Sequence, residues 1–120
     1  MLAINVDNLT DLTVIECIGR IVLDASVFRL RDAVRAQKES RSILLDLSRV
    51  QALGGSGVGM LAYLDHWARE HKIDFKLFSP SRAVTKALLE TGSFNIFGIV
   101  SFHKLQLMMG NENHHHPLPA

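Results

Sequence analysis

Hydrophobic and polar positions change their spacing several times along the chain, and each change marks an expected element. Near the N-terminus, two apolar runs flank a polar stretch at 8–11, which predicts two strands joined by a turn. The segment 20–40 then takes helical spacing, and Asp24 or Ser26 could cap its start. The apolar stripe of this helix consists of Val27, Leu30 and Val34.

A second strand and helix follow. The run SILLDLS at 42–48 is apolar without alternation, which is typical of a central strand covered on both faces, and we expect it to end near Leu47. From Ser56 the spacing is helical again, and His66 and Trp67 fall off the centre of the apolar stripe. That stripe consists of Val58, Leu61, Leu64 and Ala68.

A third strand and helix come next. The segment IDFKLFS at 73–79 alternates apolar and polar residues, so one face of this strand should be buried. Ser79 and Pro80 should begin the next helix, because proline suits a first turn, and Gly92 should end it. The inner stripe of this helix would consist of Val84, Ala87, Leu88 and Thr91.

The element order predicts the fold class. Residues 95–102 suggest a last short strand, and 101–110 a closing helix. Alternating strands and helices imply an α/β domain whose mixed, partly parallel sheet has four to five strands, with three to four helices mainly on one face. We expect one domain over residues 1–110 and a disordered, polar tail at 111–120.

Composition narrows the class of protein. The chain has 120 residues, of which 48% are hydrophobic, which is enough to build a core. Its net charge of +1 gives no indication of direct nucleic-acid binding. Cys17, the only cysteine, lies in an apolar run and should be a buried structural thiol. Neither a signal peptide nor an apolar stretch of ~20 residues is visible, so we expect a cytoplasmic protein without a membrane span. Three histidines at 114–116 lack other fixed ligands, so we expect no metal site.

The candidate chemistry lies at 54–59, which reads Gly-Gly-Ser-Gly-Val-Gly. A serine among glycines at a helix start suits a phosphate cradle, a catalytic nucleophile or a serine that is itself modified. A P-loop needs a lysine after its last glycine, where Met60 stands. A dinucleotide fingerprint needs an acid at the end of the next strand, whereas Asp74 opens that strand. We therefore expect no cofactor.

A hydrolase elbow is also incomplete. Gly54 and Ser56 fit the pattern G-x-S-x-G, but Val58 stands where the last glycine is needed. His66 and His71 lie on the helix that Ser56 starts, and the first of them is about 15 Å along its axis, beyond hydrogen-bond reach. His103 could meet Ser56 only by accident of folding, so the sequence predicts no catalytic residue.

A structural role for Ser56 competes with a chemical one. Serine is a favoured N-cap, because its oxygen accepts a hydrogen bond from a free backbone N–H, and glycines allow a tight turn before the helix. A cap does not require glycines on both sides, however. Those glycines leave the hydroxyl unshielded, as a reaction carried out by another protein would demand.

The stretch SILLDLSRVQALGGSGVGMLAYL resembles the central signature of STAS domains, the family of bacterial anti-sigma factor antagonists. Residues 46–48 match the Asp-Leu-Ser that ends an apolar strand in the family. Ser56, Gly57 and Gly59 match its Asp-Ser-Ser-Gly-Leu-Gly helix start, with Val58 at the leucine position. The segments GRIVLDASVFRLRDAVR and SPSRAVTKALLETGSFNIF also resemble the family, so the likeness covers most of the chain.

The resemblance implies a non-enzymatic regulatory module. Ser56 stands where the family has the serine phosphorylated by its partner, a serine kinase that is also the anti-sigma factor; the unmodified protein binds that kinase and frees the sigma factor. The partner-binding residues would be Gly54, Gly55, Ser56, Gly57, Val58 and Gly59. Two of these, Gly54 and Gly55, replace the family's aspartate and first serine.

An alternative function within the same family needs no phosphorylation. The chain could be a STAS-type scaffold or interaction subunit of a stress-signalling or lipid-transport complex. For either function, antagonist or scaffold, we expect protein partners and no direct contact with nucleic acid or a membrane. The sequence leaves a homodimer open.

Overall fold

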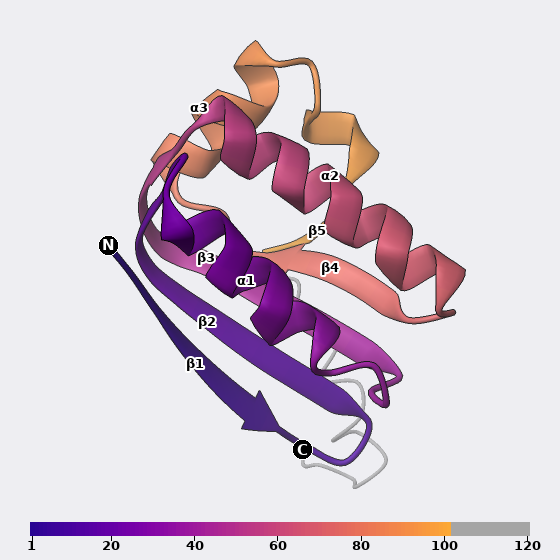
Figure 1. The fold of residues 1–120 in the computed structure, drawn as a ribbon. Coiled ribbons are helices and arrows are strands. Elements are labelled where there is room, and N and C mark those ends of the chain that lie inside the picture. The colour runs from indigo at the N-terminus through magenta and orange to yellow at the C-terminus, as the bar shows by residue number, and fades with distance from the viewer. Residues whose placement is uncertain (102–120) are drawn as a thin grey trace, which may run out of the picture.

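The computed structural model describes residues 1–101, which form one α/β domain (Figure 1). Its strands are β1 (Leu2–Asn8), β2 (Leu12–Ile21), β3 (Ser42–Leu53), β4 (Asp74–Phe78) and β5 (Gly98–Val100). Its helices are α1 (Ala25–Arg35), α2 (Gly55–Glu70) and α3 (Arg82–Glu90), and a 3₁₀ turn spans Phe94–Ile96. The closing helix expected at 101–110 and the tail expected at 111–120 lie almost wholly outside the described residues.

The five strands form one mixed sheet in the order β1-β2-β3-β4-β5. The first pair is antiparallel and the other three pairs are parallel. Each crossover from β2 onward steps to the next strand in the same direction, and because such crossovers are right-handed, α1, α2 and α3 fall on the same face. Figure 1 shows α1 and α2 side by side across that face. The predicted fold class is confirmed.

The core lies between this face of the sheet and the helices. Every second residue of the inner strands points into it, as the two-residue period of a strand requires. These strand residues are Ile15, Cys17, Ile43, Leu45, Leu47, Phe75 and Leu77, all buried. The predicted stripes of α1 and α2 are buried against them, which confirms the phase of both helices. Burial raises the pKa of the Cys17 thiol to about 12, with smaller contributions from Asp46 and Glu16.

β3 is central, as expected, but it does not end near Leu47; it continues to Leu53. Its register against β2 shifts twice, first where Glu16 and Ile18 face Asp46 and Arg49. An extra residue in one strand is a β-bulge, which bends the strand without ending it. The polar residues that follow Leu47 mark this irregularity and not the end of the strand.

Two finer predictions are wrong. Helix α3 begins two residues later than expected: its N-cap is Ser81, whose Oγ accepts a hydrogen bond from the Val84 N–H at 3.2 Å. Thr91 is the exposed C-cap of α3 and not part of its inner stripe, although Gly92 does follow with the positive φ of a helix end. Trp67 lies beside the stripe of α2 and is nonetheless buried, because its large ring reaches the core.

Asp24 caps α1 as predicted, since its Oδ1 accepts a hydrogen bond from the Ser26 N–H at 2.7 Å. None of the helices within residues 1–101 is long and apolar enough to cross a membrane.

Candidate functional site at the start of helix α2

The turn from β3 into α2 passes close to the end of β2. The N–H of Gly54, the N-cap of α2, donates a hydrogen bond to the carbonyl oxygen of Ile21 at 2.9 Å. A Cβ on Gly57 would lie 2.5 Å from Leu53 Cδ1 and 2.9 Å from that same carbonyl oxygen. No side chain fits there, so Gly57 is required for the close contact between the helix start and the sheet.

Ser56 is the second residue of α2 and does not cap it. Gly54 is the N-cap and has no side chain with which to accept a hydrogen bond, so the expectation of a serine cap is wrong. The side chain of Ser56 is half-buried, and no hydrogen bond joins its hydroxyl to any residue in the described part of the chain. The hydroxyl therefore has no structural role in the helix start.

Two glycines near this hydroxyl, Gly55 and Gly59, are exposed. A Cβ built on Gly55 or on Gly59 would meet no atom within 4 Å. Packing therefore explains Gly57 but explains neither Gly55 nor Gly59. Both glycines leave the helix surface next to Ser56 without a side chain.

The first turn of α2 is suited to a negative charge. Its first intrahelical hydrogen bond runs from the Val58 N–H to the Gly54 carbonyl oxygen at 3.0 Å. The N–H groups of Gly55, Ser56 and Gly57 precede that bond and have no partner within the helix. No acidic residue stands in this turn, so nothing there offsets the positive end of the helix dipole.

The loop between β2 and α1 adjoins this turn. Val22 lies beside Gly54, and the next residue, Leu23, is 79% exposed. Asp24 follows, and hydrogen bonds from Ser26 hold the pKa of its carboxyl below the ordinary value. A large apolar side chain and a carboxylate therefore stand near the helix start.

The outer face of α2 continues the same surface. Tyr63 lies seven residues, or about two turns, after Ser56 and hence on the same face of the helix. Its side chain is 41% exposed. We call the combined area the Ser56 surface; it consists of Leu23, Gly55, Ser56, Gly59 and Tyr63. Sequence reasoning missed Leu23 and Tyr63, because an exposed apolar residue looks like a core residue until the fold is known.

The two histidines near the C-terminal end of α2 have partners other than Ser56. His66 Nε2 lies 3.3 Å from Glu70 Oε2, further along α2, and His71 Nδ1 lies 2.8 Å from the Trp67 carbonyl oxygen. Both rings are thus engaged at the far end of the helix from Ser56. Within residues 1–101 no three His, Cys, Asp or Glu side chains converge as a metal site.

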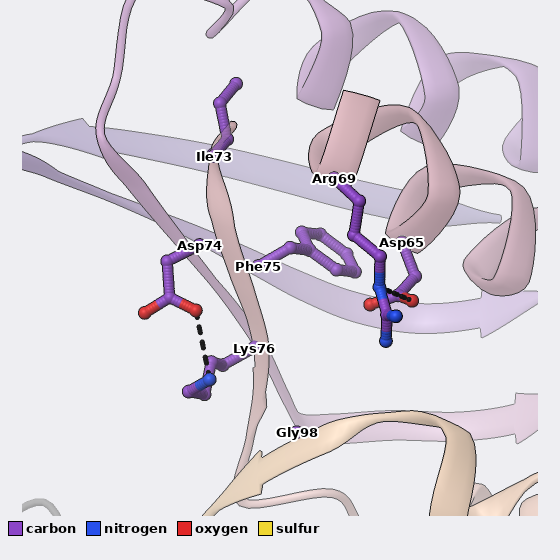
Figure 2. Close-up of a pocket in the computed structure, with 7 residues that line it drawn as sticks. All are labelled: Asp65, Arg69, Ile73, Asp74, Phe75, Lys76 and Gly98. Carbon is purple, nitrogen blue, oxygen red and sulfur yellow. Dashed lines mark hydrogen bonds and ion pairs between the residues drawn. The ribbon is translucent and has the colours of Figure 1, made fainter. Parts of the chain in front are cut away.

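A separate hollow of about 410 Å³ opens at the other end of α2, between that helix and the start of β4 (Figure 2). Phe75 lines it, and Arg69 Nε pairs with the buried Asp65 Oδ2 at 3.0 Å. Lys76 Nζ pairs with Asp74 Oδ1 at 3.0 Å. The four charged side chains that line the hollow thus form two ion pairs. Sequence reasoning did not single out the buried Asp65.

Comparison with known families identifies the fold. The sequence profile described as the STAS domain matches residues 3–106. The chain belongs to the STAS domain family. No significant match was found among curated proteins.

Solved structures resemble this STAS domain closely in fold and weakly in sequence. An anti-sigma factor antagonist from Mycobacterium paratuberculosis has a TM-score of 0.70 and 21% identity, over 82% of this chain and 85% of that one. The anti-sigma factor antagonist SpoIIAA in its unphosphorylated form has a TM-score of 0.72 and 16% identity, over 98% of this chain and all of that one. SpoIIAA of Bacillus in its phosphorylated form has a TM-score of 0.67 and 16% identity, over 88% of this chain and 96% of that one.

Proposed function

We propose that this STAS domain is an anti-sigma factor antagonist whose binding to its partner ends when Ser56 is phosphorylated. The proposal rests on the surroundings of the Ser56 hydroxyl. The hydroxyl lies at a helix start, has no hydrogen-bond partner within residues 1–101 and stands near Gly55 and Gly59, neither of which is required by packing. A kinase active site could reach this hydroxyl without disturbing any contact that stabilises the fold.

The helix start would tolerate the modified side chain. A phosphate adds about −1.5 to −2 charges at neutral pH, together with three strong hydrogen-bond acceptors. The free N–H groups of the first turn and the helix dipole favour such a charge, and no acid in that turn opposes it. Phosphorylation should therefore leave the fold intact and change only the surface.

The partner in this proposal is an anti-sigma factor that is also a serine kinase. Leu23 and Tyr63 would supply apolar contact area on the Ser56 surface, and the low profile of Gly55 and Gly59 would let the partner's backbone approach. A hydrated dianion at Ser56 would then have to be desolvated in the interface, which costs several kcal/mol for an unpaired charge. Release of the partner follows from that cost. The likeness in fold to anti-sigma factor antagonists supports this choice of partner.

One observation favours a second function. Gly54 and Gly55 occupy the positions at which the family carries an acid and a further serine, so the first turn lacks the acidic neighbour of the phosphoacceptor. A chain that is not a kinase substrate could keep the fold and the apolar part of the Ser56 surface. It would then serve as a STAS-type scaffold or interaction subunit without phosphorylation.

Incubation with an anti-sigma factor kinase and ATP, followed by intact-mass measurement, separates the two functions. The antagonist function predicts that the protein gains one phosphoryl group and that Ser56→Ala gains none. Ser48→Ala is the matched control: Ser48 is exposed, but its Oγ donates a hydrogen bond to Asp46 Oδ1 at 2.7 Å, and the variant should be modified like the wild type. Absence of modification would favour the scaffold function, and modification at another residue would contradict the role of Ser56.

A further inference from the structure

Strand β1 forms one edge of the sheet, and its hydrogen-bond pattern shows which backbone groups face outward. The Leu9 N–H donates to the Leu12 carbonyl oxygen at 2.7 Å, and the Arg20 N–H donates to the Met1 carbonyl oxygen at 3.1 Å. Because hydrogen-bonded pairs alternate in an antiparallel ladder of unbroken register, odd-numbered residues of β1 bond to β2. The outward groups belong to the even-numbered residues, which are Leu2, Ile4, Val6 and Asn8.

The first part of this edge is blocked and the rest is open. The guanidinium of Arg29 on α1 donates a hydrogen bond to the Leu2 carbonyl oxygen. Beyond Leu2, the outward backbone groups of Ile4, Val6 and Asn8 have no partner within residues 1–101. Exposed edges in native proteins are usually protected by lysine, proline or a bulge, and the sequence LAINVDN of β1 contains none of these.

We infer that the open edge of β1 pairs with β1 of a second copy of this chain, antiparallel, with Val6 on the two-fold axis. In a two-fold pair of strands, each outward-facing residue of one copy lies opposite an outward-facing residue of the other copy. A pairing centred on Ile4 or on Asn5 would engage Leu2, whose carbonyl oxygen Arg29 already holds. A pairing centred on Val6 uses only the open residues and places Ile4 opposite the partner's Asn8.

The side chains in this register complement each other. Val6, which is 41% exposed, meets the partner's Val6, so that apolar surface is buried on the axis. Asn5 stands opposite the partner's Asp7, where an amide N–H can donate to a carboxylate oxygen. Ala3 stands opposite the partner's Leu9, which is 54% exposed in the single chain. Asp7 is the only charged residue of β1, so no like charges face each other.

The dimer leaves the Ser56 surface free. Figure 1 shows β1 at the outer edge of the sheet, beyond α1, whereas α2 lies over the inner strands. Each copy would present its own Ser56 surface, so this inference does not depend on the proposed phosphorylation. The contact involves seven residues from each chain, 3–9, and should bury less than the roughly 1,200 Å² of a stable interface, so the dimer should be weak and concentration-dependent.

Cysteine cross-linking tests both the edge and the register. In hydrogen-bonded pairs the Cα atoms lie about 5.5 Å apart, within disulfide range, so Val6→Cys should join two chains when diamide accepts the two electrons and two protons of the thiols. Asn5→Cys is the matched control on the same exposed strand. Its two copies would be diagonal neighbours about 7–8 Å apart, so it should cross-link at least about tenfold more slowly. The native Cys17 is buried and should not interfere.

Sedimentation equilibrium provides the independent measurement on the unmodified protein. The apparent mass should rise from 13.4 kDa toward twice that value as concentration increases. Val6→Lys should stay monomeric, because it opposes two like charges on the axis, and an equimolar mixture with Val6→Glu should restore the dimer. A monomer at all concentrations, or faster cross-linking of Asn5→Cys than of Val6→Cys, would overturn the inference.

Discussion

Gly57 and Gly59 stand two positions apart in the same helix, yet their surroundings differ completely. A Cβ on Gly57 would overlap Leu53 Cδ1 and the Ile21 carbonyl oxygen, whereas a Cβ on Gly59 would meet nothing within 4 Å. The first glycine is required by the fold. The second lowers the stability of α2, since glycine in a helix interior costs roughly 0.5–1 kcal/mol relative to alanine.

The two alanine variants should therefore change stability in opposite directions. Gly57→Ala should lower the free energy of unfolding by about 1–3 kcal/mol, the range for overpacking a core. Gly59→Ala should raise it by about 0.5–1 kcal/mol, because alanine favours the helix. Urea denaturation followed by circular dichroism measures both. Equal effects of the two substitutions would mean that the close contact at Gly57 is not as described.

Some single-residue roles could be read from the sequence and others could not. Asp24 was one of two expected caps and does cap α1, because a side-chain oxygen before a helical stripe is a local signal. Ser56 gave the same signal but does not cap α2, since the chain turns at Gly54, two residues earlier. That turn is fixed by the contact with Ile21, which belongs to a distant strand and leaves no trace in the local sequence.

At the scale of elements, α2 is the helix on which the site depends. Its predicted stripe is buried: Leu61 and Leu64 are both 0% exposed. Leu61→Ala should lower the free energy of unfolding by about 2–5 kcal/mol, the range for deleting a buried leucine side chain. Tyr63→Ala, on the exposed face of the same helix, is the control and should cost much less. A loss of under about 0.5 kcal/mol for Leu61→Ala in chemical denaturation would contradict this burial.

Element existence was predictable, whereas element boundaries depended on tertiary contacts. The apolar run of β3 signalled a central strand, but the bulge at 46–49 was mistaken for its end. The start of α3 was placed at Ser79 and Pro80, whereas the helix begins after Ser81, whose Oγ also donates to the Val50 carbonyl oxygen at 2.6 Å. Both errors come from contacts between segments far apart in sequence.

At the scale of the whole molecule, the alternation of periods specified the α/β class and the side of the sheet that carries the helices. Once the elements are known, right-handed crossovers between neighbouring parallel strands place all three helices on the same face of the sheet. The exposed part of the Ser56 surface could not be predicted in the same way. Leu23 and Tyr63 join it only because the β2–α1 loop and α2 meet at the same end of the domain.

The proposed Ser56 switch makes a distinct prediction for the wild type and two variants of the whole protein. Ser56→Ala should keep both the fold and the affinity for the partner, because the hydroxyl has no partner among residues 1–101 and its loss should change stability by less than about 0.5 kcal/mol. Ser56→Asp should also fold, since a carboxylate in the first turn of a helix suits the dipole. Only the second substitution should weaken partner binding.

Titration calorimetry of the wild type, Ser56→Ala and Ser56→Asp against a cognate anti-sigma factor is the most direct test. The first two proteins should bind with equal affinity, and the aspartate variant should bind at least about tenfold more weakly, because its charge would be buried without a partner in the interface. Denaturation of the three proteins controls for loss of fold. Equal affinities for serine, alanine and aspartate at position 56 would place the interface elsewhere and contradict the switch.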